Sequence, residues 1–179
     1  MEQAVNVISL TLPLEQEALL SLKAGDVAEL TGTVYTARDA AHRKLAALLD
    51  EGKPLPFVLE GACIYYAGPC PAAPGEVIGP CGPTTSYRMD AYTPRMIMKG
   101  LNAMIGKGER GEAVVNAMKG RAVYFAATGG AGYLIARCIK EAEVIAFPEL
   151  GAEALRRLRV ERLPVIVAID AAGNNLYRQ

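Results

Sequence analysis

Residues 82–90 bring together side chains that could bind a small anion. They read GPTTSYRMD and stand directly before a predicted helix. The planar guanidinium of Arg88 matches a carboxylate in a bidentate pair, and backbone N–H groups at a helix start attract negative charge. An ordinary helix start would carry the same residues, with Asp90 or Thr93 as its N-cap and Arg88 on the surface. Local chemistry alone favours this second interpretation.

A second cationic group stands where a predicted strand becomes a helix. Residues 36–42 read TARDAAH, which places Arg38 and the only histidine of the chain, His42, four residues apart on one helix face. This arrangement could be an anion-binding arginine with a supporting histidine. It could equally be a helix whose polar face carries both residues, and for a lone histidine that is the more common situation.

The glycine-rich segment 106–111 reads GKGERG and matches the letters of a dinucleotide-binding fingerprint. The fingerprint needs an acidic residue about 20 positions later to hold the ribose, and none stands there. It is not a P-loop either, because no Ser or Thr follows the lysine. The glycines are better explained by close approach of the backbone to a ligand or neighbour, with Lys107 directed inward. Residues 128–132 likewise predict a turn with room for a small anion.

Four cysteines, Cys63, Cys70, Cys81 and Cys138, lack CxxC spacing, and we expect reduced thiols. Three thiolates can hold a 4Fe-4S cluster with one iron open to substrate. The intervals between the first three cysteines fit no cluster motif, and Cys63 falls in a predicted buried strand. The sequence therefore predicts no metal site on this chain.

The length and composition indicate a single domain over residues 1–179. Hydrophobic residues make up 51% of the chain, and 19 basic residues balance 19 acidic ones. A neutral chain is a poor partner for nucleic acid or an anionic membrane. No apolar run reaches the length of about 18 residues that spans a bilayer, and the N-terminus does not resemble a signal peptide, so we expect a cytoplasmic protein.

Apolar strand patterns alternate with helical patterns along the chain, which indicates an α/β fold with some antiparallel sheet. Residues 68–83 contain five prolines and four glycines and predict a shaped loop. Strands are predicted at 5–10, 27–35, 57–59, 62–66, 122–127, 144–147 and 165–169, with 57–59 and 62–66 as a hairpin. Helices are predicted at 14–23, 37–50, 92–102, 112–119, 133–140 and 152–158.

The segments 36–42, 66–69, 82–90 and 104–108, in this order, resemble the β subunit of class I fumarases and L-tartrate dehydratases over nearly the whole chain. The resemblance implies a swivelling β/β/α three-layer domain with a mixed sheet. It implies that a 4Fe-4S cluster belongs to an α subunit, in a heterodimer or α2β2 assembly, with a homodimer possible for the isolated chain. It also implies roles for particular residues. Arg38, Thr85, Arg88 and Lys107 would bind substrate carboxylates, Thr84 would abstract the proton with Arg88 and Lys107 also catalytic, and Asp39, His42, Gly129 and Gly130 would support them.

The sequence leaves three alternative functions for this chain. The first is reversible hydration of fumarate to (S)-malate, because residues 89–94 (MDAYTP) are more similar to fumarases than to tartrate dehydratases. The second is L-tartrate dehydration to oxaloacetate. The third is a non-catalytic domain that binds small anions or nucleotides, for which segment 106–111 is the best evidence.

Overall fold

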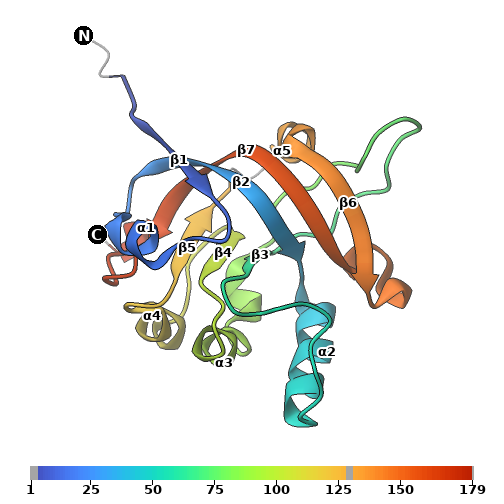
Figure 1. The fold of residues 1–179 in the computed structure, drawn as a ribbon, viewed down its shortest axis with the longest axis horizontal. Coiled ribbons are helices and arrows are strands. Elements are labelled where there is room, and N and C mark those ends of the chain that lie inside the picture. Colours follow the sequence, from blue (N-terminus) through green and yellow to red (C-terminus); the bar gives the residue numbers. More distant parts are fainter. Residues whose placement is uncertain (1–3, 128–130, 179) are drawn as a thin grey trace.

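A single mixed sheet organises the chain (Figure 1). The computed structural model describes residues 4–127 and 131–178. In chain order the elements are β1 (Val7–Thr11), α1 (Gln16–Ser21), β2 (Val27–Thr36), α2 (Asp39–Asp50), β3 (Cys63–Tyr65), η1 (Ser86–Met89), α3 (Thr93–Met98), β4 (Ala103–Gly106), α4 (Glu112–Met118), β5 (Val123–Ala126), α5 (Gly132–Cys138), β6 (Ile139–Ala146), η2 (Pro148–Glu153), β7 (Leu155–Ile169) and η3 (Leu176–Arg178).

The sheet closes on itself through its longest strand. Its seven strands follow the order β1-β2-β3-β4-β5-β7-β6, and β2 also pairs with β7. Strands β2, β3, β4, β5 and β7 therefore form a barrel-like ring. Strands β1 to β5 run parallel to one another, whereas β7 runs antiparallel to its three partners β2, β5 and β6. This parallel set places the carboxyl ends of β2, β3, β4 and β5 at one edge.

Side chains alternate between two hydrophobic cores along the short parallel strands. Cys63 and Tyr65 of β3 face one core with β1, β2 and β7, while Ile64 faces a second core. The second core packs against α2, α3 and α4, which lie together on one side of the sheet in Figure 1. Burial on both faces explains why β3, β4 and β5 are continuous apolar runs in the sequence.

The predicted hairpin over residues 57–66 is wrong. Residues 57–59 form no strand, and β3 pairs in parallel with β2 and β4 instead. Phe57 stacks on Tyr35 with ring centroids 4.4 Å apart, so its apolar character serves side-chain packing. The Glu60-Gly61 turn leads into β3 from the α2 side of the sheet.

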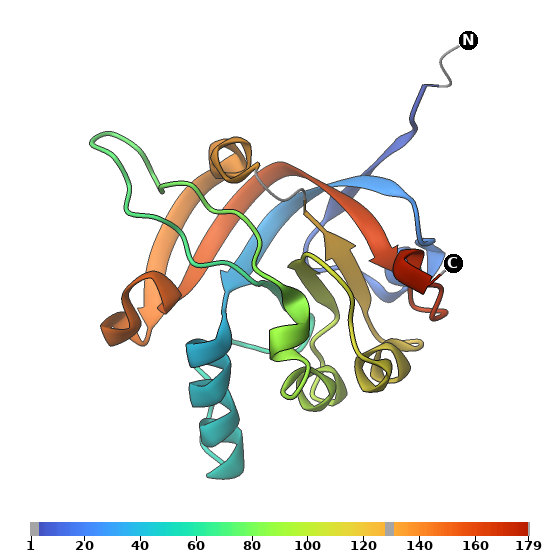
Figure 2. The same cartoon turned by 180° about the vertical axis from the view of Figure 1, so that it is seen from behind.

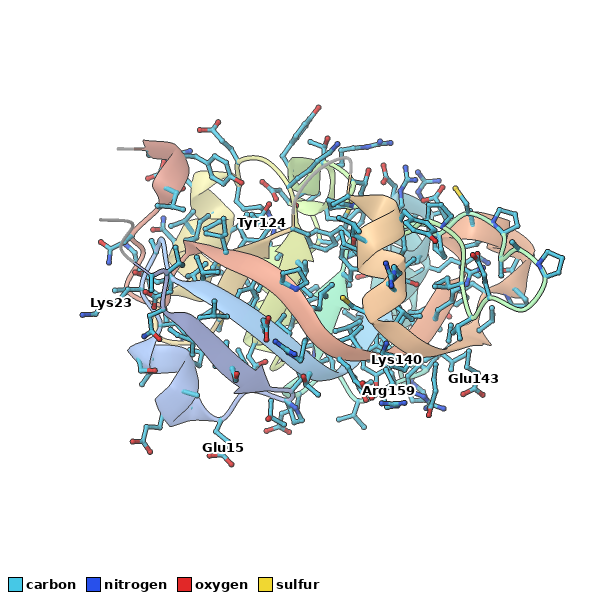
Figure 3. All side chains as sticks on the ribbon, turned by 90° about the horizontal axis from the view of Figure 1, so that it is seen from above. Glu15, Lys23, Tyr124, Lys140, Glu143 and Arg159 are labelled. Atoms are coloured by element: carbon cyan, nitrogen blue, oxygen red, sulfur yellow. The ribbon has the colours of Figure 1, made fainter. Side chains whose placement is uncertain are left out.

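The predicted helix over residues 152–158 is also wrong. Residues 148–153 form η2, and β7 begins at Leu155. The strand is stabilised on both sides, by β2 and by β6, and the outer face of β6 and β7 carries ion pairs such as Arg157–Glu143 at 2.6 Å. Glu143 and Arg159 lie along this outer face in Figure 3. Residues 139–140, predicted as the end of a helix, begin β6, which is longer than the predicted strand at 144–147.

The prediction of an α/β chain with a mixed sheet is confirmed, and the three-layer swivelling arrangement stays a prediction. Residues 68–83 contain no helix or strand, as their prolines and glycines indicated. The helices of the described residues include none with the length and apolar content needed to cross a membrane.

Candidate active site

The predicted site residues that are described gather at the carboxyl ends of the parallel strands. Arg38 and Asp39 follow β2, Tyr66 follows β3 and Lys107 follows β4. Ligands of α/β proteins bind preferentially at this edge, because the loops beyond the strand ends surround a common space. The parallel pairing of these strands therefore brings together residues that are far apart in the sequence.

Segment 82–90 is fastened to the same edge by its backbone. The Thr84 N–H donates to the Tyr66 carbonyl at 2.7 Å, and the Ser86 N–H donates to the Lys107 carbonyl at 2.9 Å. Thr85 and Lys107 form an isolated parallel bridge between these hydrogen bonds. The catalytic candidate Thr84 and the substrate-binding candidate Thr85 are thus held directly beside the end of β4.

Gly106 permits this close approach. A Cβ atom at this position would lie 1.9 Å from the Ser86 Oγ and 2.8 Å from the Tyr66 ring. Any larger residue would require the Ser86 side chain and the Tyr66 ring to move. Gly106 therefore lets the backbone of β4 lie close to a neighbour, as the sequence indicated, and one of the neighbours, Ser86, belongs to the 82–90 loop.

Arg88 pairs with Asp39 across the site. Its Nη2 atom lies 2.7 Å from the Asp39 Oδ2 atom, with 46% and 28% of the two side chains exposed. Figure 2 shows η1 beside the start of α2, the two elements that this ion pair connects. The pair holds Arg88 next to Arg38, which directly precedes Asp39.

Two polar atoms of this cationic corner are buried without a hydrogen-bond partner among the described residues. They are the Arg38 Nε and the Asp39 Oδ1. The nearest carboxylate to Arg38 is that of Glu153, whose Oε1 lies 3.9 Å from Nε, too far for a hydrogen bond. Buried polar groups are nearly always hydrogen-bonded to protein, to an ordered water or to a bound ion, so these two atoms mark a polar point of the site.

His42 lies beneath the site and does not face it. The ring is fully buried, and Nδ1 lies 2.8 Å from the Arg38 carbonyl, so Nδ1 carries the proton and donates to it. Burial lowers the pKa of His42 to about 4, against the raising effect of this hydrogen bond. The imidazole is therefore neutral at pH 7. Its support of Arg38 acts through the backbone at the start of α2.

Asp90 and Thr93 do not cap a helix, in contrast to the prediction. Helix α3 has no side-chain cap, and Asp90 instead accepts a hydrogen bond from the Arg110 Nε at 2.7 Å. The Thr93 hydroxyl donates to the Met89 carbonyl at 2.8 Å and accepts from Arg110 Nη2 at 2.9 Å. Sequence reasoning missed Arg110, because nothing in GKGERG distinguishes a buried arginine from an exposed one.

The other predicted site residues are Lys107, Gly129 and Gly130. Lys107 is exposed at the end of β4, so the prediction that it is directed inward is wrong. The supporting candidates Gly129 and Gly130 lie outside the described residues. The site thus offers Arg38, Arg88 and Lys107 as cations around two threonines, which suits a small molecule with more than one carboxylate.

The cysteines do not assemble into a cluster site. Cys63 and Cys81 are buried, Cys70 is exposed and Cys138 is half-buried. Burial raises the pKa of the Cys63 thiol and raises that of Cys81 to about 12, so neither favours the thiolate that iron binds. In the part of the chain that is described, no three His, Cys, Asp or Glu side chains are grouped to hold a metal ion. These residues therefore do not fit a 4Fe-4S cluster.

Comparison with known proteins places the chain in a family. The profile described as "Fumarase C-terminus" matches residues 1–179. This chain belongs to the fumarase C-terminus family. It is 40% identical over 84% of its length to the anaerobic class I fumarate hydratase of Escherichia coli, and 35% identical over 95% to fumarate hydratase 2 of Leishmania major. It is 36% identical over 93% of its length to a putative L(+)-tartrate dehydratase subunit beta of Methanocaldococcus jannaschii.

The extent of these matches differs between the relatives. This chain spans 28% of the length of the Escherichia coli fumarate hydratase and 31% of the length of the Leishmania major fumarate hydratase. It spans 89% of the tartrate dehydratase subunit. Its size thus corresponds to one part of the longer relatives and to nearly all of the shorter one.

Proposed function

We propose that this chain is the β subunit of a two-subunit iron–sulfur hydro-lyase that reversibly hydrates fumarate to (S)-malate. In this proposal an α subunit completes the site, in a heterodimer or α2β2 assembly, and carries the 4Fe-4S cluster. The relatives named fumarate hydratase, of which this chain matches about a third or less, support the reaction. The relative named as a β subunit supports the division into two chains.

The cationic corner at the carboxyl edge of the sheet is the observation that carries the proposal. Arg38 directly precedes Asp39 in the chain, Arg88 pairs with the Asp39 carboxylate, and the Arg38 Nε and Asp39 Oδ1 lack partners among the described residues. A dicarboxylate substrate would supply acceptors for the arginines. The α subunit would cover the same corner, so both groups would be satisfied in the assembled enzyme.

The chemistry of hydration and dehydration suits these residue types. Removing a proton next to a carboxylate builds negative charge on that carboxylate in the transition state. A fixed cation or donor aimed at such charge is worth roughly 3 kcal/mol of barrier. Arg88 and Lys107 would provide it, while Arg38 and Thr85 would hold the substrate in register.

Thr84 is the proposed proton-transfer residue. Its backbone N–H is bonded to the Tyr66 carbonyl, and the next residue, Thr85, bridges to Lys107, so the Thr84 backbone is fixed near the end of β4. A neutral hydroxyl needs help to act as a base, and the nearby Lys107 would supply it. We also propose that the chain has the three-layer swivelling β/β/α fold that the resemblance implies.

Steady-state assays on the co-purified αβ complex test the proposal. We expect turnover of fumarate and (S)-malate, with L-tartrate slower by at least tenfold. Turnover of L-tartrate without fumarate or malate would instead assign the chain to a tartrate dehydratase, which the subunit-sized relative favours. Tight binding of NAD or ATP to the chain alone, measured by calorimetry beside malate, would support a non-catalytic nucleotide-binding domain.

A further inference from the structure

Arg110 is a fully buried cation that contacts both segments of the candidate site. Its side chain is 0% exposed, although arginine is among the residues least often buried. Nε donates to the Asp90 Oδ1 at 2.7 Å and Nη2 donates to the Thr93 hydroxyl at 2.9 Å. Asp90 ends the 82–90 segment and Thr93 begins α3. Arg110 itself follows Lys107 by three residues, so one guanidinium joins the two loops.

Two tyrosines extend this connection to the backbone of the site. The Arg110 guanidinium lies 5.0 Å from the ring centroids of both Tyr66 and Tyr124. The Tyr66 carbonyl accepts the Thr84 N–H, and the Tyr124 hydroxyl lies 2.8 Å from both the Ser86 Oγ and the Gly108 carbonyl, to one of which it donates. Tyr124 projects from β5 and is labelled in Figure 3. Apart from Met104 of β4, whose sulfur lies 3.6 Å from Arg110 Nη1, these neighbours of the guanidinium each hold a part of segment 82–90 or of segment 106–111.

The buried charge is compensated where it lies. Desolvation acts to lower the pKa of Arg110, but Tyr66 and the Asp90 carboxylate outweigh it, so the pKa is raised and the guanidinium stays charged. The second Asp90 oxygen accepts the Gly111 N–H, which ties the carboxylate to the glycine-rich segment as well. A charge-assisted pair of this kind fixes distance and direction together, because the guanidinium is planar and its donors point in fixed directions.

We propose that Arg110 is a positioning residue that fixes the segment carrying Thr84 and Arg88 relative to Lys107. The catalytic consequence rests on the proposed function, whereas the structural one does not. A displacement of about 1 Å between reacting groups can cost 100-fold in rate, so the geometry beneath the site controls turnover without touching substrate.

Two variants and one control test this role. Arg110→Lys keeps the charge but loses the planar guanidinium. A lysine ammonium cannot donate to both Asp90 and Thr93 while it lies against the rings of Tyr66 and Tyr124. Tyr124→Phe removes the bonds to Ser86 and Gly108 and leaves the Arg110–Asp90 pair intact. Arg95→Lys is the matched control, because Arg95 pairs with Asp50 at 2.5 Å on the exposed surface.

Amide hydrogen exchange, measured on the full chain without the α subunit, gives a readout that does not depend on enzymatic activity. We expect Arg110→Lys and Tyr124→Phe to speed exchange at least tenfold in peptides covering 82–90 and 106–111, with the β1–β2 region unchanged. The control should match the wild type in all peptides. Unchanged exchange in both segments in the two variants would overturn the proposal. If Arg110→Lys loses protection throughout the chain, Thr93→Val takes its place, because this change removes the hydroxyl that accepts from Arg110 Nη2. Unchanged exchange in both segments of Thr93→Val would then overturn the proposal.

Kinetics of the αβ complex give the second readout. We expect kcat to fall at least tenfold for Arg110→Lys with KM within threefold of the wild type, at temperatures where both complexes are fully folded. A loss of activity that disappears when the fraction folded is corrected for would overturn the positioning role. If the wild-type complex turns over neither fumarate, malate nor tartrate, the proposed function fails, and the exchange experiment still decides the placement of the two segments.

Discussion

The Arg88 guanidinium lies 2.7 Å from the Asp39 carboxylate and joins η1 to the first residue of α2. Asp39 follows Arg38 directly, so the ion pair sets the distance between the two arginines of the site. Only one oxygen of Asp39 is used in this pair, and the other is buried without a partner among the described residues. The pair therefore fixes the direction of the Arg88 guanidinium relative to the start of α2.

Replacing Arg88 with alanine should lower the activity of the αβ complex at least tenfold, because a fixed cation beside the developing charge is lost. The stability of the chain should change little, since nearly half of the Arg88 side chain is exposed and such ion pairs contribute at most about 1 kcal/mol. Activity is measured by steady-state assay and stability by urea unfolding. Arg95→Ala is the control, and near-normal kinetics of Arg88→Ala would place Arg88 outside the site.

A double-mutant cycle should show that Asp39 acts through Arg88. Asp39→Asn keeps a hydrogen-bond acceptor but removes the charge that holds the guanidinium, so we expect a three- to tenfold loss of kcat/KM. In the Arg88→Ala background the same change should have almost no effect, because residues in one contact are not additive. The four complexes are compared under identical assay conditions. Full additivity would mean that Asp39 serves catalysis independently of Arg88.

Local patterns predicted strands at β1, β2 and β5, but they missed β4 and failed where distant pairing decides the structure. The short apolar run that forms β5 is buried on both faces, and its sequence indicates this directly. The start of β7 contains Leu155 and Leu158 at helical spacing among good helix formers. Pairing with β2 on one side and β6 on the other overrides that preference, and neither partner is adjacent in the sequence.

The residues of the candidate site were predicted from the family resemblance. Their contacts with one another could not be predicted from the sequence. Spacing alone cannot show that η1 lies against α2, so the Arg88–Asp39 pair had no sequence signal. The same holds for Arg110, whose partners Asp90, Thr93 and Tyr124 come from three separate elements. The close approach at Gly106 was partly predictable, because a glycine after a buried strand indicates contact with a backbone or ligand.

Gly106→Ala should destabilise the chain by about 1–3 kcal/mol, the usual cost of overpacking. The new Cβ atom would lie 1.9 Å from the Ser86 Oγ and 2.8 Å from the Tyr66 ring, so Ser86 of η1 and the Tyr66 ring must move. Urea unfolding measures the loss. Gly82→Ala is the matched control, because a Cβ there makes only ordinary contact with Gly132 at 3.7 Å. Equal stability of the two variants would show that η1 yields without cost.

His42 should make the stability of the chain depend on pH in a defined window. Its pKa is lowered by burial from 6.5 to about 4 in the folded chain, so between these values the unfolded chain binds more protons. Stability is therefore fully present above pH 6.5 and is lost as the pH falls toward 4, with about 2 kcal/mol lost between pH 7.5 and pH 5.

Replacing His42 with asparagine isolates this contribution, because His42 is the only histidine of the chain. The Asn amide can still donate to the Arg38 carbonyl, as the Nδ1–H does, but it does not titrate. Free energies of unfolding in urea are measured for both chains at pH 7.5, 6.5, 5.5 and 5. The wild type should lose about 2 kcal/mol more than His42→Asn over this range. Parallel profiles would mean that the imidazole is protonated as readily in the folded chain as in the unfolded one, and its burial beneath Arg38 would then have no electrostatic consequence.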